Sequence, residues 1–542
     1  MKPFIALALL PLTASLSGDP LTPKQSAAID AIFAESITPQ SPGCGVALIR
    51  GGSIVQFKGY GLTDVERRIP WTPQSVFHPG SIYKQFFAAG MEMLAREGKL
   101  SLDDDVRKYL PEIPDYGSRI TVRDLLTHTH GLREYHDLLE LAPVSVNDDK
   151  EMLRLMGDQR APASPPRKKF NYGNTGPQLA AMIAKRVSGV SAAQYVAPRI
   201  LEPLEMKSTS FGNDGRETPP NVPGYQRQND GSFEARTGGS NRITLEDLAR
   251  WNQQFDTADA EWQAIMRRLT TPATLDDGTV LDAGMSLRLR PYRGLRRVWS
   301  PGAARGFRAI FMRFPDVPLT IAMGCNRDDL DPIRIAEAIA DVVLADKLQR
   351  VTPARVRLTK QQRRAFVGTY ISQADVVRVI ERNGSLYLVS DGKEFEMVPA
   401  GGGRFVFPGK PVVLRDAAVD LQFRPRGHFD LHTVWEPAEF TEIQPVDPRA
   451  VRPADYVGTY ASQELQSTLE VLNSKDGLLL KTPRGQFALE PVAADLFRTA
   501  SEGFQRTAGS QLVRFSRERG AVVAATVSRA YQLKIVFTRQ PD

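Results

Sequence analysis

The sequence predicts an α+β domain, built from an antiparallel sheet and a separate helical lobe, followed by two small antiparallel β-barrels. Residues 19–350 have strand-like patterns at both ends and a mostly helical middle. Beyond residue 350 the chain consists of short alternating apolar runs separated by glycine, asparagine, aspartate and proline, which is typical of antiparallel strands. A five-residue pattern occurs twice in that C-terminal part.

The first elements of the α+β domain are a helix and two strands. The helix is predicted to begin at Thr22-Pro23, because threonine is a good helix cap and proline is favoured in the first turn. Strands are predicted at residues 46–50 and 54–60, and the two glycines between them form a turn.

A mostly helical segment then covers about residues 80–255. Strands are predicted at residues 285–289, 307–313 and 319–323, and a last helix at residues 332–348. Two strands, a helical insertion, three strands and a helix imply an antiparallel sheet with its own helical lobe. A cleft between two such lobes is a natural ligand site.

The C-terminal repeat predicts the barrels. Residues 366–370 read Phe-Val-Gly-Thr-Tyr, and residues 456–460 read Tyr-Val-Gly-Thr-Tyr. About ninety residues of this pattern fit one up-and-down barrel, so we expect barrels at 356–446 and 447–542. The alternative is a single two-sheet sandwich. The similarity continues at a nearly constant offset in two further phenylalanine pairs, Phe405 with Phe497 and Phe423 with Phe515.

Composition excludes several classes of protein. The 542 residues are 42% hydrophobic and 24% charged, which is ordinary for globular proteins and excludes disorder and collagen. The net charge of +7, from 69 basic and 62 acidic residues, is too mild to indicate nucleic-acid binding. Two cysteines allow at most one disulfide and no thiolate-rich metal site.

The N-terminus resembles a secretory signal peptide. Lys2 precedes an apolar run at residues 4–13, and small residues follow up to about residue 18. A frayed apolar terminus is the alternative. The run is shorter than the roughly 20 residues that span a bilayer, so no membrane insertion is expected. Residues 1–18 therefore predict a periplasmic or secreted protein.

A candidate nucleophile and base lie at the start of the helical segment. Ser81 follows Pro79-Gly80, at a helix start where backbone amides are free. Lys84 lies three residues later, on the same helical face. A serine hydroxyl becomes a good nucleophile when an adjacent base takes its proton, and a lysine with a lowered pKa can be that base. Taken alone, this pattern fits a plain helix cap better.

A second motif supports the catalytic interpretation. Tyr172 and Asn174 lie two apart on a predicted turn, where both can face one cleft. With these motifs the chain resembles the serine β-lactamase and penicillin-binding-protein family, on the side of the class C enzymes, esterases and D-peptidases. Ser81-x-x-Lys84 matches the first family motif, and Tyr172-x-Asn174 matches the second.

Further segments match the family in order over about residues 30–345. Residues 125–132, Leu-Leu-Thr-His-Thr-His-Gly-Leu, are similar to its helix-end signature. Gly238-Gly239-Ser240 matches another signature, and Asn326-Arg327-Asp328 resembles the end of the last strand. The resemblance implies a β-lactamase/transpeptidase-like fold. It is strongest to the D-aminopeptidases, which also carry two small, lipocalin-like β-barrels.

The third motif departs from the family. Members normally have Lys or His, any residue and Gly on the strand that lines the cleft. Here Ser300-Pro301-Gly302 occupies that place. A serine can donate a hydrogen bond, but it cannot supply positive charge. The departure predicts weaker leaving-group protonation or weaker recognition of a substrate carboxylate.

The resemblance implies a residue role for each motif. Ser81 is expected to form an acyl ester, with Lys84 as the base and Tyr172 completing the proton relay. The backbone amides of Ser81 and Ala303 are expected to form the oxyanion hole. No cofactor or metal is implied. The residues expected to bind substrate are Asn174, Ser300, Gly302 and Arg305.

The predicted function is that of an exported D-aminopeptidase-like peptidase or amidase on small substrates. A carboxylesterase or a β-lactamase-type hydrolase is the first alternative. A catalytically weak protein that binds peptides or cell-wall fragments is the second. The expected partner is a small peptide, amide or ester, with no nucleic acid, and a homodimer is left open.

Three further features leave alternatives open. His128, His130 and His136 lack the carboxylate or thiolate that would complete a zinc site. Cys44 and Cys325 lie on strands that are antiparallel neighbours in the family fold. Buried free thiols are the favoured expectation for this pair, and a disulfide is the alternative. Five arginines are expected on a solvated face or, alternatively, in a cationic rim that replaces the third-motif cation: Arg288, Arg290, Arg293, Arg296 and Arg297.

Overall fold

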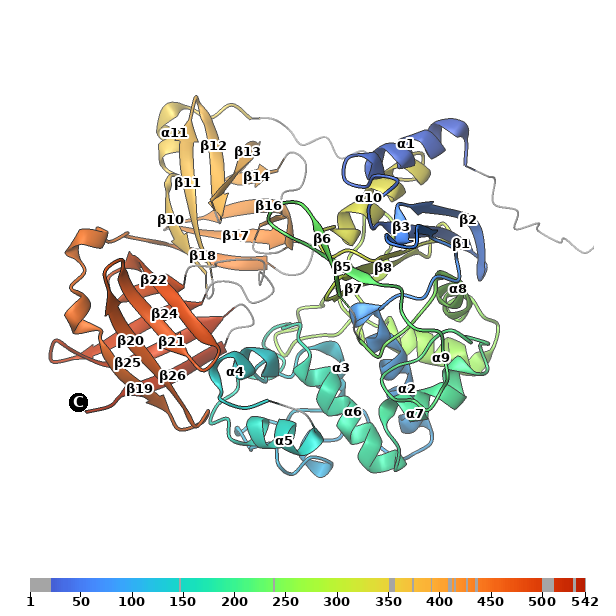
Figure 1. Ribbon diagram of the computed structural model, residues 1–542, viewed down its shortest axis with the longest axis horizontal. Helices are drawn as coiled ribbons and strands as arrows, with labels where there is room; N and C mark the ends of the chain where they lie inside the picture. The colour runs from blue at the N-terminus through green and yellow to red at the C-terminus, as the bar shows by residue number, and fades with distance from the viewer. Residues whose placement is uncertain are drawn as a thin grey trace, which may run out of the picture.

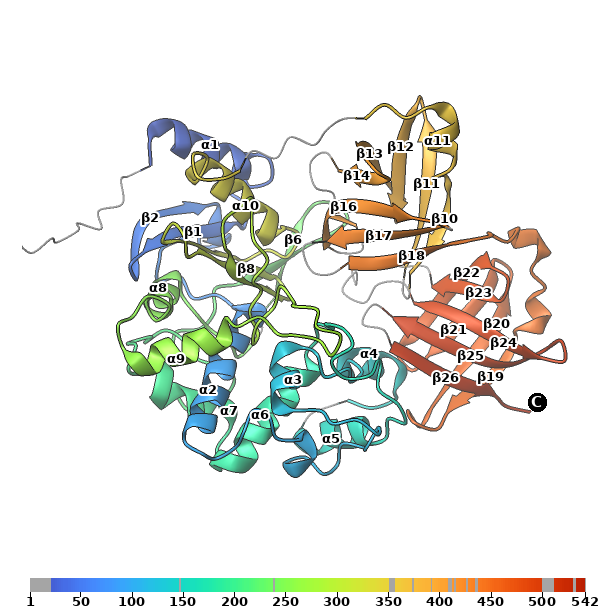
Figure 2. The same ribbon diagram turned by 180° about the vertical axis from the view of Figure 1, so that it is seen from behind.

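The computed structural model describes residues 21–145, 148–236, 239–349, 356–372, 375–390, 392–407, 412–413, 416–425, 427–433, 437–499, 511–529 and 533–541. The predicted signal peptide and Gly238 lie outside these residues. Figures 1 and 2 show a sheet-and-helix domain with two β-barrels beside it. No helix in the described ranges has the length and apolar character needed to cross a membrane.

A five-stranded antiparallel sheet forms the centre of the first domain, in the order β2-β1-β9-β8-β7. It confirms the strands predicted at residues 46–50, 54–60, 307–313 and 319–323. Two short hairpins flank it, β3 (Leu62–Asp64) with β4 (Ile69–Pro70) and β5 (Gly224–Arg227) with β6 (Phe233–Arg236). The sheet strands are β1 (Cys44–Arg50), β2 (Ser53–Tyr60), β7 (Val298–Ala304), β8 (Phe307–Phe314) and β9 (Leu319–Cys325).

The strand predicted at residues 285–289 is wrong. This segment forms only isolated bridges, of which one pairs Arg288 with Trp299. Ser286 has φ 57°, a left-handed conformation that interrupts an extended strand. The strand that completes the sheet is β7, which carries the third motif.

Helices cover both faces of the sheet. On one face α1 (Pro23–Ala34) and α10 (Pro332–Val343) contact each other and enclose a core with Phe33, Trp299 and Ile321. The predicted start of α1 is confirmed, because the Thr22 hydroxyl accepts a hydrogen bond from the Gln25 amide in a capping box. On the other face lie α8 (Leu245–Gln253) and the helical lobe, which comprises α2 (Lys84–Arg96), α3 (Val122–Thr127), α4 (Tyr135–Leu141), α5 (Asp149–Gly157), α6 (Thr175–Ser188), α7 (Ala192–Val196) and α9 (Ala260–Leu269).

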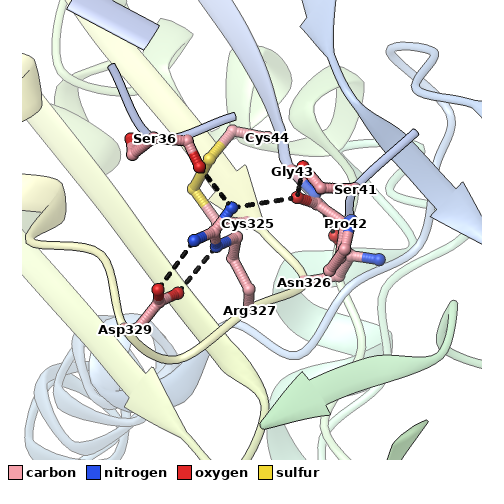
Figure 3. The surroundings of a disulfide bond; sticks show 9 residues. All are labelled: Ser36, Ser41, Pro42, Gly43, Cys44, Cys325, Asn326, Arg327 and Asp329. Atoms are coloured by element: carbon pink, nitrogen blue, oxygen red, sulfur yellow. Dashed lines mark hydrogen bonds and ion pairs between the residues drawn. A yellow bond between two sulfur atoms is a disulfide. The ribbon is translucent and has the colours of Figure 1, made fainter. Parts of the chain in front are cut away.

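A disulfide joins the ends of two neighbouring sheet strands (Figure 3). Cys44 on β1 lies directly opposite Cys325 on β9, and their Cα atoms are 4.0 Å apart. The expectation of two free thiols is therefore wrong, because direct cross-strand pairing brings the two sulfur atoms within bonding reach. Beside it, Arg327 donates to both Asp329 carboxylate oxygens, at 2.6 and 2.7 Å, and to the Ser36 carbonyl oxygen at 2.7 Å.

We expect the disulfide to contribute about 3 to 5 kcal/mol to the free energy of unfolding, because it closes a long loop. The bonded residues are 281 positions apart. The double variant Cys44→Ala/Cys325→Ala should therefore unfold at lower denaturant concentration than the oxidised protein, and reductant should remove that difference. Thiol titration of the unfolded, unreduced protein should detect no free thiol. Two free thiols would contradict the bond.

The two barrels confirm the repeat and exclude the single sandwich. After the short helix α11 (Lys360–Arg364), the strands of the first barrel close into a ring through pairing of β14 with β16. The first barrel comprises β10 (Gly368–Ile371), β11 (Val376–Arg382), β12 (Ser385–Ser390), β13 (Lys393–Gly401), β14 (Arg404–Val406), β15 (Val412–Val413), β16 (Asp416–Arg424), β17 (His428–Thr433) and β18 (Pro437–Ile443). The second is a closed barrel of β19 (Gly458–Ser462), β20 (Ser467–Ser474), β21 (Gly477–Thr482), β22 (Gly485–Ala493), β23 (Leu496–Thr499), β24 (Leu512–Glu518), β25 (Ala521–Arg529) and β26 (Leu533–Arg539).

Equivalent residues of the repeat make the same contacts in both barrels. The Tyr370 hydroxyl donates to the Phe366 carbonyl oxygen at 2.9 Å, and the Tyr460 hydroxyl donates to the Tyr456 carbonyl oxygen at 2.6 Å. Aromatic packing is repeated too, since the rings of Phe405 and Phe423 are 5.7 Å apart and those of Phe497 and Phe515 are 5.5 Å apart. The short sequence repeat therefore marks two copies of one barrel architecture.

Candidate active site

The turn that carries Ser81 packs tightly against the third-motif strand. Ser81 lies in a one-turn 3-10 helix, η1 (Gly80–Tyr83), directly before α2. Gly80 has φ 53°, and a Cβ atom on it would lie 2.2 Å from the Ala303 nitrogen. A Cβ atom on Gly302 would lie 1.9 Å from the Pro79 carbonyl oxygen. Only glycine permits both the positive φ and this approach, which brings the Ala303 amide next to the serine turn.

Lys84 joins the first motif to the second. Its side chain is only 2% exposed, and its ammonium group lies over the Tyr172 ring, 4.3 Å from the centroid. The Nζ atom donates to the Tyr172 hydroxyl at 2.9 Å, to the Asn174 Oδ1 atom at 2.8 Å and to the Gly173 carbonyl oxygen at 3.2 Å. The structure thus brings Tyr172 and Asn174, from the turn before α6, to Lys84, which begins α2 directly after the Ser81 turn.

The Ser81 hydroxyl is half-buried and has no hydrogen-bond partner among the described residues. Catalytic hydrogen bonds are often formed fully only when substrate is bound. The Lys84 Nζ atom faces the second motif with the three hydrogen bonds given above.

Glu134 orients Asn174 from the side opposite Lys84. Its carboxylate accepts hydrogen bonds from the backbone amides of Asn174 at 2.7 Å and Thr175 at 3.1 Å, which are at the start of α6. It also accepts from the Asn174 side-chain nitrogen at 3.2 Å, which leaves the Asn174 oxygen to face Lys84. Sequence reasoning assigned Glu134 no role. Its only signal was its position just after the helix-end signature.

Burial disfavours the charged form of Glu134, but the hydrogen bond and attraction from His136 and the two backbone amides outweigh burial and lower the pKa of Glu134 to about 2. Because this pKa is lower in the folded than in the unfolded protein, the stabilisation is present above about pH 4.5 and is lost as pH falls toward 2. Its size is about 3 kcal/mol.

We therefore expect the denaturant midpoint to fall between pH 4.5 and pH 2 more steeply in the wild type than in Glu134→Gln. Glu261, which is exposed, provides the control: Glu261→Gln should keep the wild-type pH dependence. Parallel curves for Glu134→Gln and the wild type would contradict this account of Glu134.

The helix-end signature supports the second-motif turn. His128 ends α3 in a left-handed conformation, and its backbone carbonyl oxygen accepts a hydrogen bond from the Asn171 amide at 2.8 Å. Its ring lies 4.6 Å from the Tyr172 ring. Burial, then the nearby Lys84, His130 and Arg288 charges, hold the pKa of His128 well below its usual range, so the imidazole is neutral.

The three histidines considered for zinc do not form one cluster. The His130 ring accepts a hydrogen bond from the Leu132 amide, and His136 pairs with Glu134 at 2.9 Å. Within the described ranges no group of three or more metal-binding side chains is present.

The remaining predicted substrate residues lie along β7 and its turn. Ser300 is 4% exposed and pairs with Phe311 on β8. Arg305 is exposed at the turn between β7 and β8, and no described hydrogen bond joins it to Ser81, Lys84 or Tyr172. Gly302 contacts the serine turn, so it has a structural reason to be a glycine.

Most arginines of the predicted cationic rim form ion pairs with carboxylates. Three of the arginines pair with carboxylates: Arg293 with Asp341, Arg296 with Asp316 and Arg297 with Glu337. The guanidinium of Arg288 lies 4.1 Å from the centroid of the Phe170 ring, beside the second motif.

An aromatic groove of about 350 Å³ lies beside the nucleophile turn. Tyr83, from the same turn as Ser81, lines it together with Phe87 and Phe211. The Tyr83 and Phe87 rings are 5.2 Å apart, and the Phe87 and Phe211 rings are 6.0 Å apart. The rest of the lining is mixed, because it includes polar and charged residues such as Asp149, Gln178, Lys185 and Asn213.

The second barrel packs on α4, the helix that follows Glu134 (Figures 1 and 2). Arg133 forms a buried ion pair with Glu464 at 2.6 Å and donates to the Lys534 carbonyl oxygen at 3.0 Å. Arg529 of the barrel, 3% exposed, lies 3.5 Å from the Asp137 carboxylate. The barrel thus holds the segment that orients Asn174.

Comparisons with known proteins find a family model and several relatives that match the chain. The Beta-lactamase family model matches residues 29–345. A D-aminopeptidase of Gluconobacter oxydans is 27% identical over 61% of this chain, which corresponds to 63% of its own length, just under two thirds. A penicillin-binding protein of Bacillus subtilis is 26% identical over 70% of this chain and 89% of its own. The solved octameric penicillin-binding protein homologue from Pyrococcus abyssi shares the fold, with a TM-score of 0.54, 23% identity, and coverage of 77% of this chain and 99% of that one.

Proposed function

Because the chain belongs to the beta-lactamase family, we propose that it hydrolyses small peptides or amides through an acyl ester on Ser81, as a D-aminopeptidase-like enzyme. One observation carries the proposal. Lys84, which is buried and begins the helix after the Ser81 turn, is hydrogen-bonded to both Tyr172 and Asn174. A protein that only binds peptides has no need of this arrangement, which matches the requirements of a serine nucleophile and its base.

The proposed reaction has two halves. The Ser81 oxygen bonds to the substrate carbonyl carbon while Lys84, in its neutral form, accepts the hydroxyl proton. The carbon–nitrogen bond then breaks, and Tyr172 relays the proton from Lys84 to the leaving amine. In the second half, water attacks the ester carbonyl carbon while the same groups take its proton, the bond to the Ser81 oxygen breaks, and that proton returns to Ser81 as the acid leaves. The amides of Ser81 and Ala303 hold the oxyanion in both halves, a role worth about 3 kcal/mol per donor.

Several features support the finer parts of the proposal. The rings of Tyr83, Phe87 and Phe211 line one part of the groove beside the Ser81 turn, and an apolar group of a substrate can pack on them. The Cys44–Cys325 disulfide fits an oxidising compartment, in keeping with export of a protein whose first 18 residues resemble a signal peptide. We propose further that the barrels limit substrate size and do no chemistry, since the second barrel covers the segment next to Asn174.

An activated ester is the second candidate substrate class. Ser300 cannot supply the third-motif charge that assists leaving-group departure. Activated esters need less protonation of the leaving group than amides do, so they depend less on that charge.

A substrate panel tests the proposed function. The full chain is assayed with D- and L-amino-acid amides, short esters and nitrocefin, with Ser81→Ala as the blank. The proposal predicts the highest kcat/KM for D-amino-acid amides. Highest activity toward nitrocefin would support a β-lactamase, and highest activity toward short esters would support an esterase. A fully inactive panel, together with no labelling of Ser81 by a fluorophosphonate, would support the binding protein.

A further inference from the structure

We infer that Arg288 supplies the positive charge that the third motif lacks in this chain, acting as a positioning residue for Tyr172. The inference rests on the proposed function, because it assigns a role in the same proton relay. It is carried by the place of Arg288 between the third-motif strand and the second-motif turn.

The backbone of Arg288 is attached to the third-motif strand. Its amide donates to the Trp299 carbonyl oxygen at 2.9 Å, and the Trp299 amide donates back at 2.9 Å. Trp299 is the neighbour of Ser300, the residue found where the family has Lys or His. The side chain of Arg288 therefore begins close to the position at which family members carry the Lys or His of the third motif.

The side chain of Arg288 extends to the second motif. Its guanidinium carbon lies 4.1 Å from the Phe170 ring centroid and 5.4 Å from the Tyr172 ring centroid. The residue is only 7% exposed, so water screens this charge weakly. Stacking of a guanidinium on an aromatic face is favourable and restricts the orientation of both groups.

The charges around Tyr172 make the role of Arg288 specific. Lys84 donates to the Tyr172 hydroxyl, and His128, whose ring is 4.6 Å from the Tyr172 ring, is neutral. When Tyr172 gives its proton to a leaving amine, negative charge develops on its oxygen. Arg288 is a positive charge that stays in place throughout the cycle, whereas Lys84 gains and loses its proton. It therefore stabilises that developing charge as a third-motif cation would.

The relay role predicts a change in the ratio of amide to ester turnover. Arg288→Gln should lower kcat for an amino-acid amide by about 30-fold and kcat for the matching p-nitrophenyl ester by about threefold or less, since general-acid assistance is worth about 10²–10⁴ and a good leaving group needs little of it. KM should change by less than about threefold for both substrates. Fluorophosphonate labelling of Ser81 should keep its wild-type rate, because fluoride leaves without the relay.

Two replacements should restore the charge. Arg288→Lys should keep most of the amide activity. Ser300→Lys, introduced into the Arg288→Gln variant, should recover amide turnover by about tenfold by returning a cation to the family position. Arg296→Gln is the matched control, because Arg296 belongs to the same run but pairs with Asp316 and is exposed. It should leave both activities unchanged.

The outcomes distinguish a failure of the Arg288 inference from a failure of the proposed function. Equal losses of amide and ester turnover in Arg288→Gln, with no recovery in Arg288→Lys or with Ser300→Lys, would reduce Arg288 to a packing residue and overturn the inference. Unchanged amide turnover in Arg288→Gln would also overturn it. If the wild type itself fails to label at Ser81, the proposed function is wrong, and this inference falls with it.

Discussion

Replacing Ser81 by alanine is expected to lower turnover of the best substrate by at least about 10⁴-fold, since loss of a serine nucleophile removes the covalent route altogether. The fold should be unaffected. The Ser81 side chain is half-buried and has no hydrogen-bond partner in the described part of the chain, so the change removes only one small polar group. We would measure kcat/KM together with the thermal unfolding midpoint, which should move by less than about 2 °C.

An exposed serine provides the control for this variant. Ser232 lies in the turn between β5 and β6, where its hydroxyl donates to the Asp230 carboxylate at 2.7 Å, and Ser232→Ala should keep full activity. If Ser81→Ala retained more than a few per cent of wild-type kcat/KM while folded, another group would have to be the nucleophile, and the Lys84 geometry would need a different explanation.

The second large effect is expected at the contact between the second barrel and the site. Glu464→Ala leaves Arg133, which is 6% exposed, without its carboxylate partner. Breaking a buried ion pair in this way costs about 3 to 5 kcal/mol. The Arg133 carbonyl oxygen also accepts a hydrogen bond from the Thr175 hydroxyl at 2.9 Å, and the neighbouring Glu134 orients Asn174. We therefore expect a lower denaturant midpoint together with a drop in kcat of about tenfold.

A matched pair in the same barrel separates a general charge effect from this one. Glu470 and Lys481 form an ion pair at 2.9 Å with both side chains exposed, so Glu470→Ala should cost less than about 1 kcal/mol and leave kcat unchanged. The double variant Arg133→Met/Glu464→Leu should regain most of the lost stability, because it leaves no unpaired charge. A Glu464→Ala protein with wild-type midpoint and kcat would show that the barrel does not support the site.

Long, repeated or strongly patterned features of the fold were predictable from the sequence. The alternating pattern after residue 350 and the repeat ending in Tyr370 and Tyr460 predicted two barrels, because a period of two and a repeated aromatic contact are local properties. The prediction of a strand at residues 285–289 was wrong because the conformation of this segment is not a local property. Its apolar pattern resembles a strand, but the left-handed Ser286 and pairing limited to Trp299 are set by the surrounding structure.

The site residues that could be predicted were likewise those that belong to short sequence motifs. Ser81-x-x-Lys84 and Tyr172-x-Asn174 predicted one shared site, and the structure joins Lys84 to Tyr172 and Asn174 by hydrogen bonds. The role of Glu134 depends on a contact across about 40 residues, and no spacing rule predicts it. The place of Arg288 depends on its backbone pairing with Trp299. The sequence alone does not distinguish Arg288 from the other arginines of its run. The disulfide required the register of β1 against β9.

The acyl ester on Ser81 is the central claim, and rapid-quench mass spectrometry of the full chain tests it most directly. The protein is mixed with a D-amino-acid ester and quenched in acid within one turnover, then digested and sequenced by tandem mass spectrometry. The account predicts one adduct with the mass of the acyl group, on the peptide that contains Ser81, and its absence from Ser81→Ala. Substrate turnover with no adduct at Ser81 at any quench time, or with an adduct on another residue, would contradict the account.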